Sequence, residues 1–119
     1  MGGHRPQRVA EEIKKELAKI LREDVKEEVL RLVTVTAVNV SSDLRYVKIY
    51  FTLLGGKGDK GAVAELLEKS SGWLRGELGR RLRLRFAPEL QFVYDESIEH
   101  GARIMELLNK VNQNEESRD

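Results

Sequence analysis

Residues 33–53, VTVTAVNVSSDLRYVKIYFTL, constrain the fold more than any other part of the chain. Their first part is rich in β-branched side chains, and its alternation changes phase near Ala37, which is typical of a strand with a bulge. From Val47 to Leu53, residues of the two faces alternate strictly. Because only the short turn SSDL separates the two runs, the sequence predicts an antiparallel hairpin of strands 33–40 and 45–53 with one apolar face.

Helical periodicity precedes the hairpin. Apolar residues recur at helical spacing from Val9 to Leu21, and Pro6 suits a first helical turn. We therefore expect a helix over residues 6–23. A short connector over residues 24–32, irregular or weakly helical, then leads into the first strand.

Two helical segments follow the hairpin. The loop at residues 55–61 contains Asp59, the expected N-cap of the next helix. That helix reaches Ser70, Ser71 and Gly72, which are poor interior helix formers, before apolar residues return at helical spacing. This pattern predicts a helix, a kink and a second helix.

A third strand is expected over residues 89–95. Because helices connect it to the hairpin, it can pair in parallel through a right-handed crossover. Ser97 is the expected cap of a last helix, and the polar residues 112–119 form a predicted disordered tail. The prediction is an α+β fold with a three-stranded mixed sheet, helices on one face and a C-terminal helix, in a single domain over residues 1–111.

Several classes of function are excluded or disfavoured by composition. The chain has no cysteine, so disulfides, iron–sulfur clusters and thiolate catalysis are excluded. No apolar run approaches the roughly 20 residues that cross a bilayer, and the N-terminus lacks a signal-peptide core. We expect a soluble cytoplasmic protein with no membrane partner. His4 and His100 are the only histidines, and no metal-ligand or nucleophile–base spacing occurs, so we expect no metal, no cofactor and no catalysis.

The charge of the chain is unevenly distributed. The net charge is +1, yet residues 69–85 contain one acid, Glu77, and a block of six cations: Lys69, Arg75, Arg80, Arg81, Arg83 and Arg85. Residues 95–119 are acidic. From charge alone, a face that docks on an anionic partner and an ordinary solvated helix face are equally good interpretations.

Helical geometry sharpens the first interpretation. With residues 72–83 on a helix, the leucines of the segment face the core, and the opposite side is a ridge of three glycines edged by arginines: Gly72, Gly76 and Gly79. Glycines there would let a phosphodiester backbone approach closely, while guanidinium groups supply hydrogen-bond donors. The alternative is that glycine is merely tolerated near a kink and a helix end.

Arg81 does not fit this ridge, because it falls on the apolar side of the helix. Either it extends past the core to solvent, or the helix ends before it and the segment RLRLRF is extended. In the extended form Leu82, Leu84 and Phe86 would point inward, and the arginines outward.

Three segments resemble bacterial ribosome-binding factor A: RPQRVAEEIKKEL, VTAVNVSSDLRYVKIYFTLLG and SSGWLRGELGRRLRLRFAPELQFVYDES. The resemblance runs from Arg5 to about Leu108. It implies a KH-like fold of the type II order α-β-β-α-kink-α-β. The family carries an Ala-x-Gly kink, and the matching positions here are Ser70, Ser71 and Gly72, with serine in place of alanine.

The resemblance also implies a function. Family members bind the immature 30S small ribosomal subunit and its 16S rRNA, assist late maturation including processing of the RNA 5′ end, support growth in the cold, and leave with the help of a GTPase. We therefore expect a monomeric RNA-binding protein. Its expected RNA contacts are the arginines of the basic block and a set of outer cations: Arg75, Arg80, Arg81, Arg83, Arg85, Lys57, Lys60, Lys69, Arg5 and Arg8.

Two alternatives remain open from the sequence. The arginines could serve a protein-interaction module that binds an acidic partner. A general single-strand binder would stack bases on aromatic side chains, but Trp73 is the only aromatic residue that the sequence places in the basic block.

Overall fold

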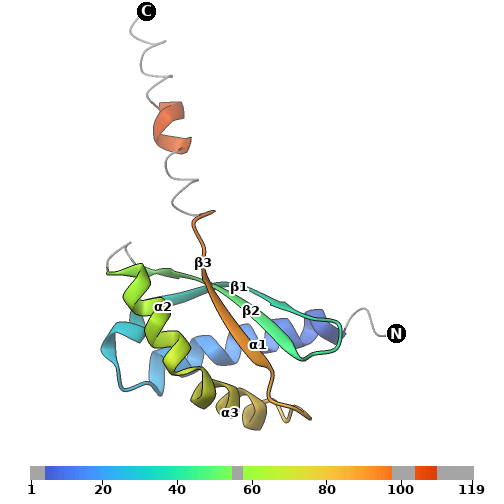
Figure 1. Cartoon of the computed structure of the whole chain (residues 1–119). Helices are drawn as coiled ribbons and strands as arrows, with labels where there is room; N and C mark the ends of the chain where they lie inside the picture. The colour runs from blue at the N-terminus through green and yellow to red at the C-terminus, as the bar shows by residue number, and fades with distance from the viewer. Residues whose placement is uncertain (1–4, 55–57, 98–103, 110–119) are drawn as a thin grey trace, which may run out of the picture.

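The computed structural model describes residues 5–54, 58–97 and 104–109. The chain runs through two layers of secondary structure (Figure 1). The elements are α1 (Arg5–Glu23), the 3-10 helix η1 (Glu28–Leu32), β1 (Val33–Val40), β2 (Tyr46–Leu53), α2 (Lys60–Lys69), α3 (Ser71–Arg81) and β3 (Glu89–Tyr94). This order confirms the predicted α+β arrangement.

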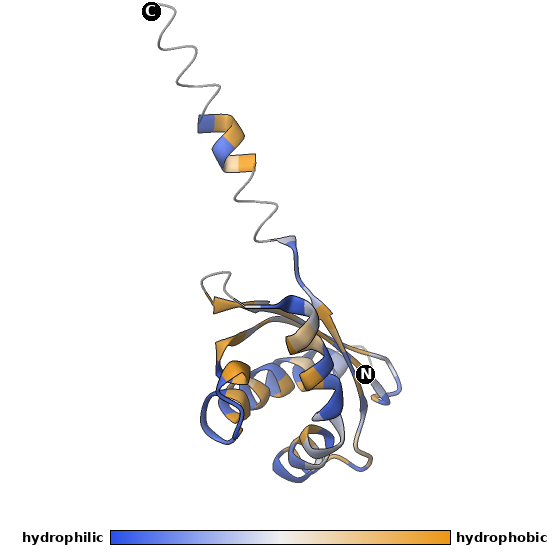
Figure 2. Ribbon diagram, turned by 60° about the vertical axis from the view of Figure 1, so that its left-hand side comes forward, coloured by the Kyte–Doolittle hydropathy of each residue, from blue (hydrophilic) through white to orange (hydrophobic). Residues whose placement is uncertain are grey.

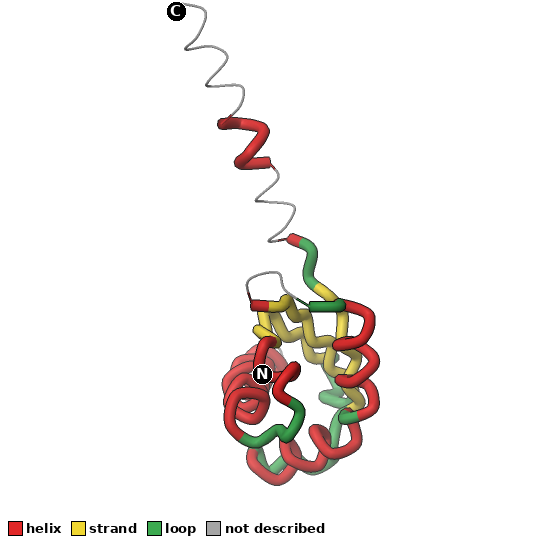
Figure 3. Tube along the Cα trace, turned by 90° about the vertical axis from the view of Figure 1, so that its left-hand side faces the viewer, coloured by secondary structure: helices red, strands yellow, loops and turns green. Residues whose placement is uncertain are grey.

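The three strands form one sheet in the order β1-β2-β3. β1 pairs with β2 antiparallel, and the register shifts between Val35 and Ala37, which confirms the predicted bulge. β3 pairs with β2 in parallel, from Tyr46 opposite Glu89 to Phe51 opposite Tyr94. The crossover through α2 and α3 makes this parallel pairing possible, and the helices lie on one side of the sheet (Figure 3).

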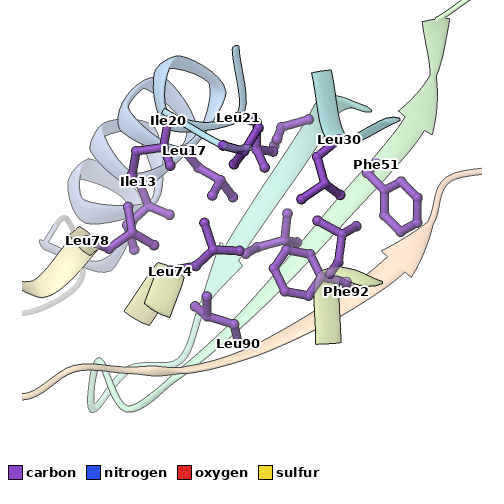
Figure 4. Close-up of a cluster of buried hydrophobic side chains, with 14 of the residues drawn as sticks. Ile13, Leu17, Ile20, Leu21, Leu30, Phe51, Leu74, Leu78, Leu90 and Phe92 are labelled. Atoms are coloured by element: carbon purple, nitrogen blue, oxygen red, sulfur yellow. The ribbon is translucent and has the colours of Figure 1, made fainter. Parts of the chain in front are cut away.

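The core lies between the sheet and these helices. Every second residue of β2, from Val47 to Leu53, is buried as the alternation predicts. Apolar residues occur on both the strands and the helices that enclose this layer (Figure 2). Side chains from α1, η1, α3 and all three strands belong to one buried cluster (Figure 4), with ten labelled members: Ile13, Leu17, Ile20, Leu21, Leu30, Phe51, Leu74, Leu78, Leu90 and Phe92.

The helix breaks where the sequence predicts a kink. Ser70 ends α2 and precedes α3, with φ −88° and ψ −3°. Its N–H donates to the Leu66 carbonyl at 3.0 Å, and its carbonyl accepts from the Leu74 N–H at 2.9 Å, so helical hydrogen bonds persist across the break. Gly72 lies inside α3 with open space around an added Cβ. The change of direction is therefore centred on Ser70 and does not require glycine at position 72.

The end of α3 agrees with the first of the two alternatives for Arg81, in which this residue is still on the helix. The helix continues through Arg81, and Leu82 forms its C-cap. Arg83 then adopts φ 53°, and the Leu84 N–H donates to the Gly79 carbonyl at 2.9 Å. This is the Schellman arrangement, in which a left-handed residue ends a helix. The inward orientation of Phe86 that the extended alternative implied is not found, because Phe86 is 62% exposed.

Hydrogen bonds to Asp95 explain why β3 ends at Tyr94. The Thr36 hydroxyl donates to its Oδ2 at 2.6 Å, and the Ser97 N–H donates to its Oδ1 at 2.9 Å. Hydrogen bonds from Ser97 and Thr36 lower the pKa of Asp95.

Asp59 caps α2 as predicted, accepting from the Gly61 N–H at 2.9 Å.

Residues 104–109 are helical and exposed, in agreement with the predicted C-terminal helix. Its expected start at residues 98–103 and the tail at 112–119 lie outside the described residues, so the tail stays a prediction. None of the helices described is both long enough and apolar enough to span a membrane.

Candidate nucleic-acid interface

Four arginines from distant parts of the chain line one surface hollow of about 480 Å³. Arg5 and Arg8 come from the first turn of α1, and Arg83 and Arg85 come from the connection between α3 and β3. Apolar side chains, including Val47, complete the lining. We call this feature the arginine hollow. The two pairs are far apart in sequence. The packing of α1 beside the end of α3 brings them together.

Two carboxylates, Glu12 and Asp43, also line the arginine hollow. Because four arginines outnumber them, the lining remains cationic overall. Asp43 is held in the β1–β2 turn, where it accepts from the Ser41 hydroxyl at 2.6 Å and the Arg45 N–H at 3.1 Å. The hydrogen bond from Ser41, and after it the one from Arg45, lowers the pKa of Asp43.

The four arginines of the hollow are available to a ligand. Among the described residues, no carboxylate oxygen comes within 4.0 Å of a guanidinium nitrogen of these four side chains. The guanidinium carbon of Arg85 lies 5.5 Å from the centre of the Phe86 ring. A planar cation beside an exposed ring offers both charge and a stacking surface.

The backbone around the hollow is conformationally unusual. Leu44 has φ 63° and Arg83 has φ 53°, and no other non-glycine residue of the described chain has a positive φ. Both residues line the arginine hollow. A left-handed conformation costs a residue with a Cβ about 1–2 kcal/mol. The fold therefore keeps an arginine at a helix end where glycine would be more stable.

Arg81 is committed to contacts inside the protein. Its side chain is 21% exposed and meets three carboxylates: Asp24 at 2.6 Å, Glu77 at 3.2 Å and Glu16 at 3.6 Å. The hydrogen bond to Asp24 is the main cause that raises the pKa of Arg81. Arg81 lies on the apolar side of α3, as its helical position predicted. It therefore faces α1 and joins the two helices. We call this group the Arg81 seam.

Arg75 and Arg80 are intermediate cases. The Arg75 Nε donates to the Pro88 carbonyl at 2.8 Å, and its Nη2 donates to the Ala87 carbonyl at 3.3 Å. Arg75 thus fixes the connection before β3 against α3. Arg80 pairs with Glu77 at 2.7 Å, but its side chain is 70% exposed and can still contact a phosphate.

Two of the predicted lysine contacts, Lys60 and Lys69, do not line the arginine hollow. Lys60 lies over the Tyr94 ring at 4.5 Å, at the far end of β3. Lys69 pairs with Glu65 at 3.4 Å along α2. Lys57 lies outside the described residues. The glycine ridge is also shorter than expected, because a Cβ at Gly79 would contact Ala87 at 3.7 Å, whereas Gly76 faces open space.

Sequence reasoning missed Arg45, Tyr46 and the exposed face of Phe86. These side chains line a second hollow of about 300 Å³, together with Arg75 and Glu89. The Glu89 N–H donates to the Arg45 carbonyl at 2.8 Å, so parallel pairing of β2 and β3 brings Arg45 beside the connection. No local pattern reveals this, because the register of a parallel pair joined through helices is not readable from periodicity.

The described residues contain no group of three or more histidine, aspartate or glutamate side chains placed to hold a metal ion. The arginine and aromatic side chains that line the two hollows can recognise anions and planar groups.

Comparisons with known proteins identify the family of this chain. Residues 5–108 match the family model described as ribosome-binding factor A. A relative from Desulforamulus reducens, named ribosome-binding factor A, is 46% identical over 112 residues, which cover 94% of this chain and 93% of the relative. A relative with the same name from Natranaerobius thermophilus is 44% identical over 117 residues, which cover 98% and 89% of the two chains.

Solved structures show the same fold. The crystal structure of ribosome-binding factor A from Thermus thermophilus superposes with a TM-score of 0.67 at 25% identity, covering 75% of this chain and 94% of that one. A homology model of the Thermus thermophilus factor, fitted into a cryo-EM map of a 30S complex, has a TM-score of 0.61 at 28% identity, covering 73% and 91%. Sequence match, element order and fold together place this chain in the ribosome-binding factor A family.

Proposed function

We propose that this protein binds the immature 30S small ribosomal subunit and that the arginine hollow contacts phosphates of its 16S rRNA. The observation that carries the proposal is the convergence of Arg5, Arg8, Arg83 and Arg85 on one hollow with no carboxylate partner among the described residues. Arg80 adds an exposed cation on α3. The complex formed by the Thermus thermophilus factor supports the choice of the 30S subunit as partner.

The biological role follows that of the family. In this proposal the monomeric protein acts in the cytoplasm during late maturation of the subunit, including processing of the 16S rRNA 5′ end. It supports growth in the cold and is released with the help of a GTPase. It works by binding, without a catalytic step or cofactor.

Charge reversal tests the mechanism. Phosphate contacts release counterions, so binding to purified small subunits should weaken steeply between about 50 and 200 mM salt. The Arg83→Glu/Arg85→Glu variant should bind weakly and show a smaller salt dependence. The matched control is Lys26→Glu/Arg31→Glu, which makes the same charge change beyond the C-terminal end of α1, a helix ~28 Å long. Equal binding by the two variants would contradict a role for the hollow.

The alternative partner is an acidic protein. Capture from lysate with and without ribonuclease separates the two cases. If subunit components disappear after ribonuclease treatment, RNA is the ligand. A partner that persists and is lost in Arg83→Glu/Arg85→Glu would indicate the protein-interaction alternative.

A further inference from the structure

Phe86 stands between two arginine-lined hollows. Phe86 lines the arginine hollow and also the smaller hollow of Arg45, Tyr46 and Arg75. A large aromatic side chain that is 62% exposed gains little from burial in the core, so packing does not explain its presence. Its position instead makes it accessible from both hollows.

The backbone that carries Phe86 is anchored even though the ring is exposed. Arg75 donates to the carbonyls of Ala87 and Pro88 at 3.3 and 2.8 Å. Before Phe86 in the chain, the Schellman hydrogen bond from the Leu84 N–H to the Gly79 carbonyl fixes the end of α3. The ring is therefore presented by a segment held at both ends, which lowers the entropy lost when a ligand orders it.

Both of the hollows that Phe86 lines also contain arginines. Arg83 and Arg85 lie in the arginine hollow, and Arg45 lies in the smaller one. Tyr46, which is 58% exposed, adds a second aromatic group in the smaller hollow. An exposed ring shared by two arginine-containing hollows matches one nucleotide, whose base is planar and whose sugar is joined to a phosphate on each side.

We propose that Phe86 stacks on an unpaired base of the bound RNA, while arginines of the two hollows contact the phosphates on either side. This inference rests on the proposed function, because it takes RNA as the ligand, and it specifies the part of the RNA recognised. Bases in an A-form duplex are stacked on one another and cannot meet the ring, whereas bases in loops and bulges can. An acidic peptide would use the arginines but has no planar group for Phe86.

A hairpin RNA with one unpaired 2-aminopurine tests the inference, because stacking on an aromatic ring changes its fluorescence. The full-length protein should quench the unpaired probe and bind it more tightly than the same hairpin with that base paired. Phe86→Ala should abolish the quenching and weaken binding roughly 5- to 150-fold, the range that corresponds to about 1–3 kcal/mol per stacked base. It should leave the salt dependence unchanged, since no charge is removed.

The matched control is Trp73→Ala, which removes another exposed aromatic side chain from outside both hollows. It should bind and quench like the wild type. If Phe86→Ala quenches and binds like the wild type, or if Trp73→Ala alone shows the loss, the inference is overturned. The proposed function would still stand in either case if Arg83→Glu/Arg85→Glu loses small-subunit binding. An equal effect of Phe86→Ala on the paired and unpaired hairpins would also overturn stacking on an unpaired base.

Discussion

The Arg81 seam and the arginine hollow use the same residue types for opposite purposes. Arg81 and Arg83 are two positions apart, yet Arg81 meets three carboxylates while Arg83 projects from a left-handed backbone into an open hollow. Phe86 and Phe92 differ in the same way, with exposed fractions of 62% and 9%. The end of α3 is where the chain changes from residues that hold the fold together to residues that a partner can reach.

This difference shows why a run of basic residues cannot be interpreted as one surface. A guanidinium that faces α1 finds acids supplied by that helix and by the residue after it, and so stabilises the protein. Directly after Arg81 the chain leaves the helix, and its next arginines, Arg83 and Arg85, are exposed beside the first turn of α1. Three pairs of variants test this division, in order of decreasing effect on stability.

The largest expected effect separates the two phenylalanines. Phe92→Ala should lower the free energy of unfolding by roughly 3–5 kcal/mol, because it leaves a cavity in the core beside the sheet. Phe86→Ala should change it by no more than about 0.5 kcal/mol, since its ring is exposed. Urea denaturation measures both values. Similar losses in the two variants would mean that Phe86 belongs to the core and would break the comparison.

Removal of the Arg81 side chain should have an intermediate effect. Arg81→Ala leaves Glu16, Asp24 and Glu77 without their shared cation and should destabilise the protein by about 1–2 kcal/mol, a value reduced by partial exposure to solvent. Arg80→Ala, which removes a well-exposed cation from the same Glu77, is the control and should cost less than about 0.5 kcal/mol. Thermal or urea unfolding would show the difference, and equal losses would remove the distinction between seam and surface.

The smallest expected effect has the opposite sign. Arg83→Gly should stabilise the protein by up to about 1 kcal/mol, because glycine adopts the left-handed helix end without the strain of a Cβ. The same variant should bind small subunits more weakly. Arg83→Ala removes the charge without relieving the strain, so it should lose binding without gaining stability. A stability gain in the alanine variant would contradict the strain argument.

Much of the fold was predictable because local patterns agree with it. Strict alternation over Val47–Leu53 identified the buried face of β2, the phase change at Ala37 identified the bulge, and Asp59 identified the start of α2. The connection between α3 and β3 was less predictable. Alternation in RLRLRF is equally compatible with a strand or with a helix end, and the left-handed turn at Arg83 has no glycine to mark it.

The candidate site was predictable only in part. The sequence identified the arginines and the amphipathic geometry that sets Arg81 apart, because charge and helical angle are properties of a short segment. It did not reveal that Arg75 is bound to backbone carbonyls, or that Arg45 and Tyr46 lie beside Phe86.

By itself, the sequence determined the identity and order of the helices and strands, the buried faces of the strands and the family, since these depend on periodicity and on residues close together in the chain. Only the tertiary structure decided which arginines are available to a ligand. The availability of each arginine near the end of α3 depends on whether α1 places a carboxylate or another arginine beside it. For Arg45 it depends on the parallel register of β2 and β3. Both are contacts between residues far apart in sequence, and no local pattern records them.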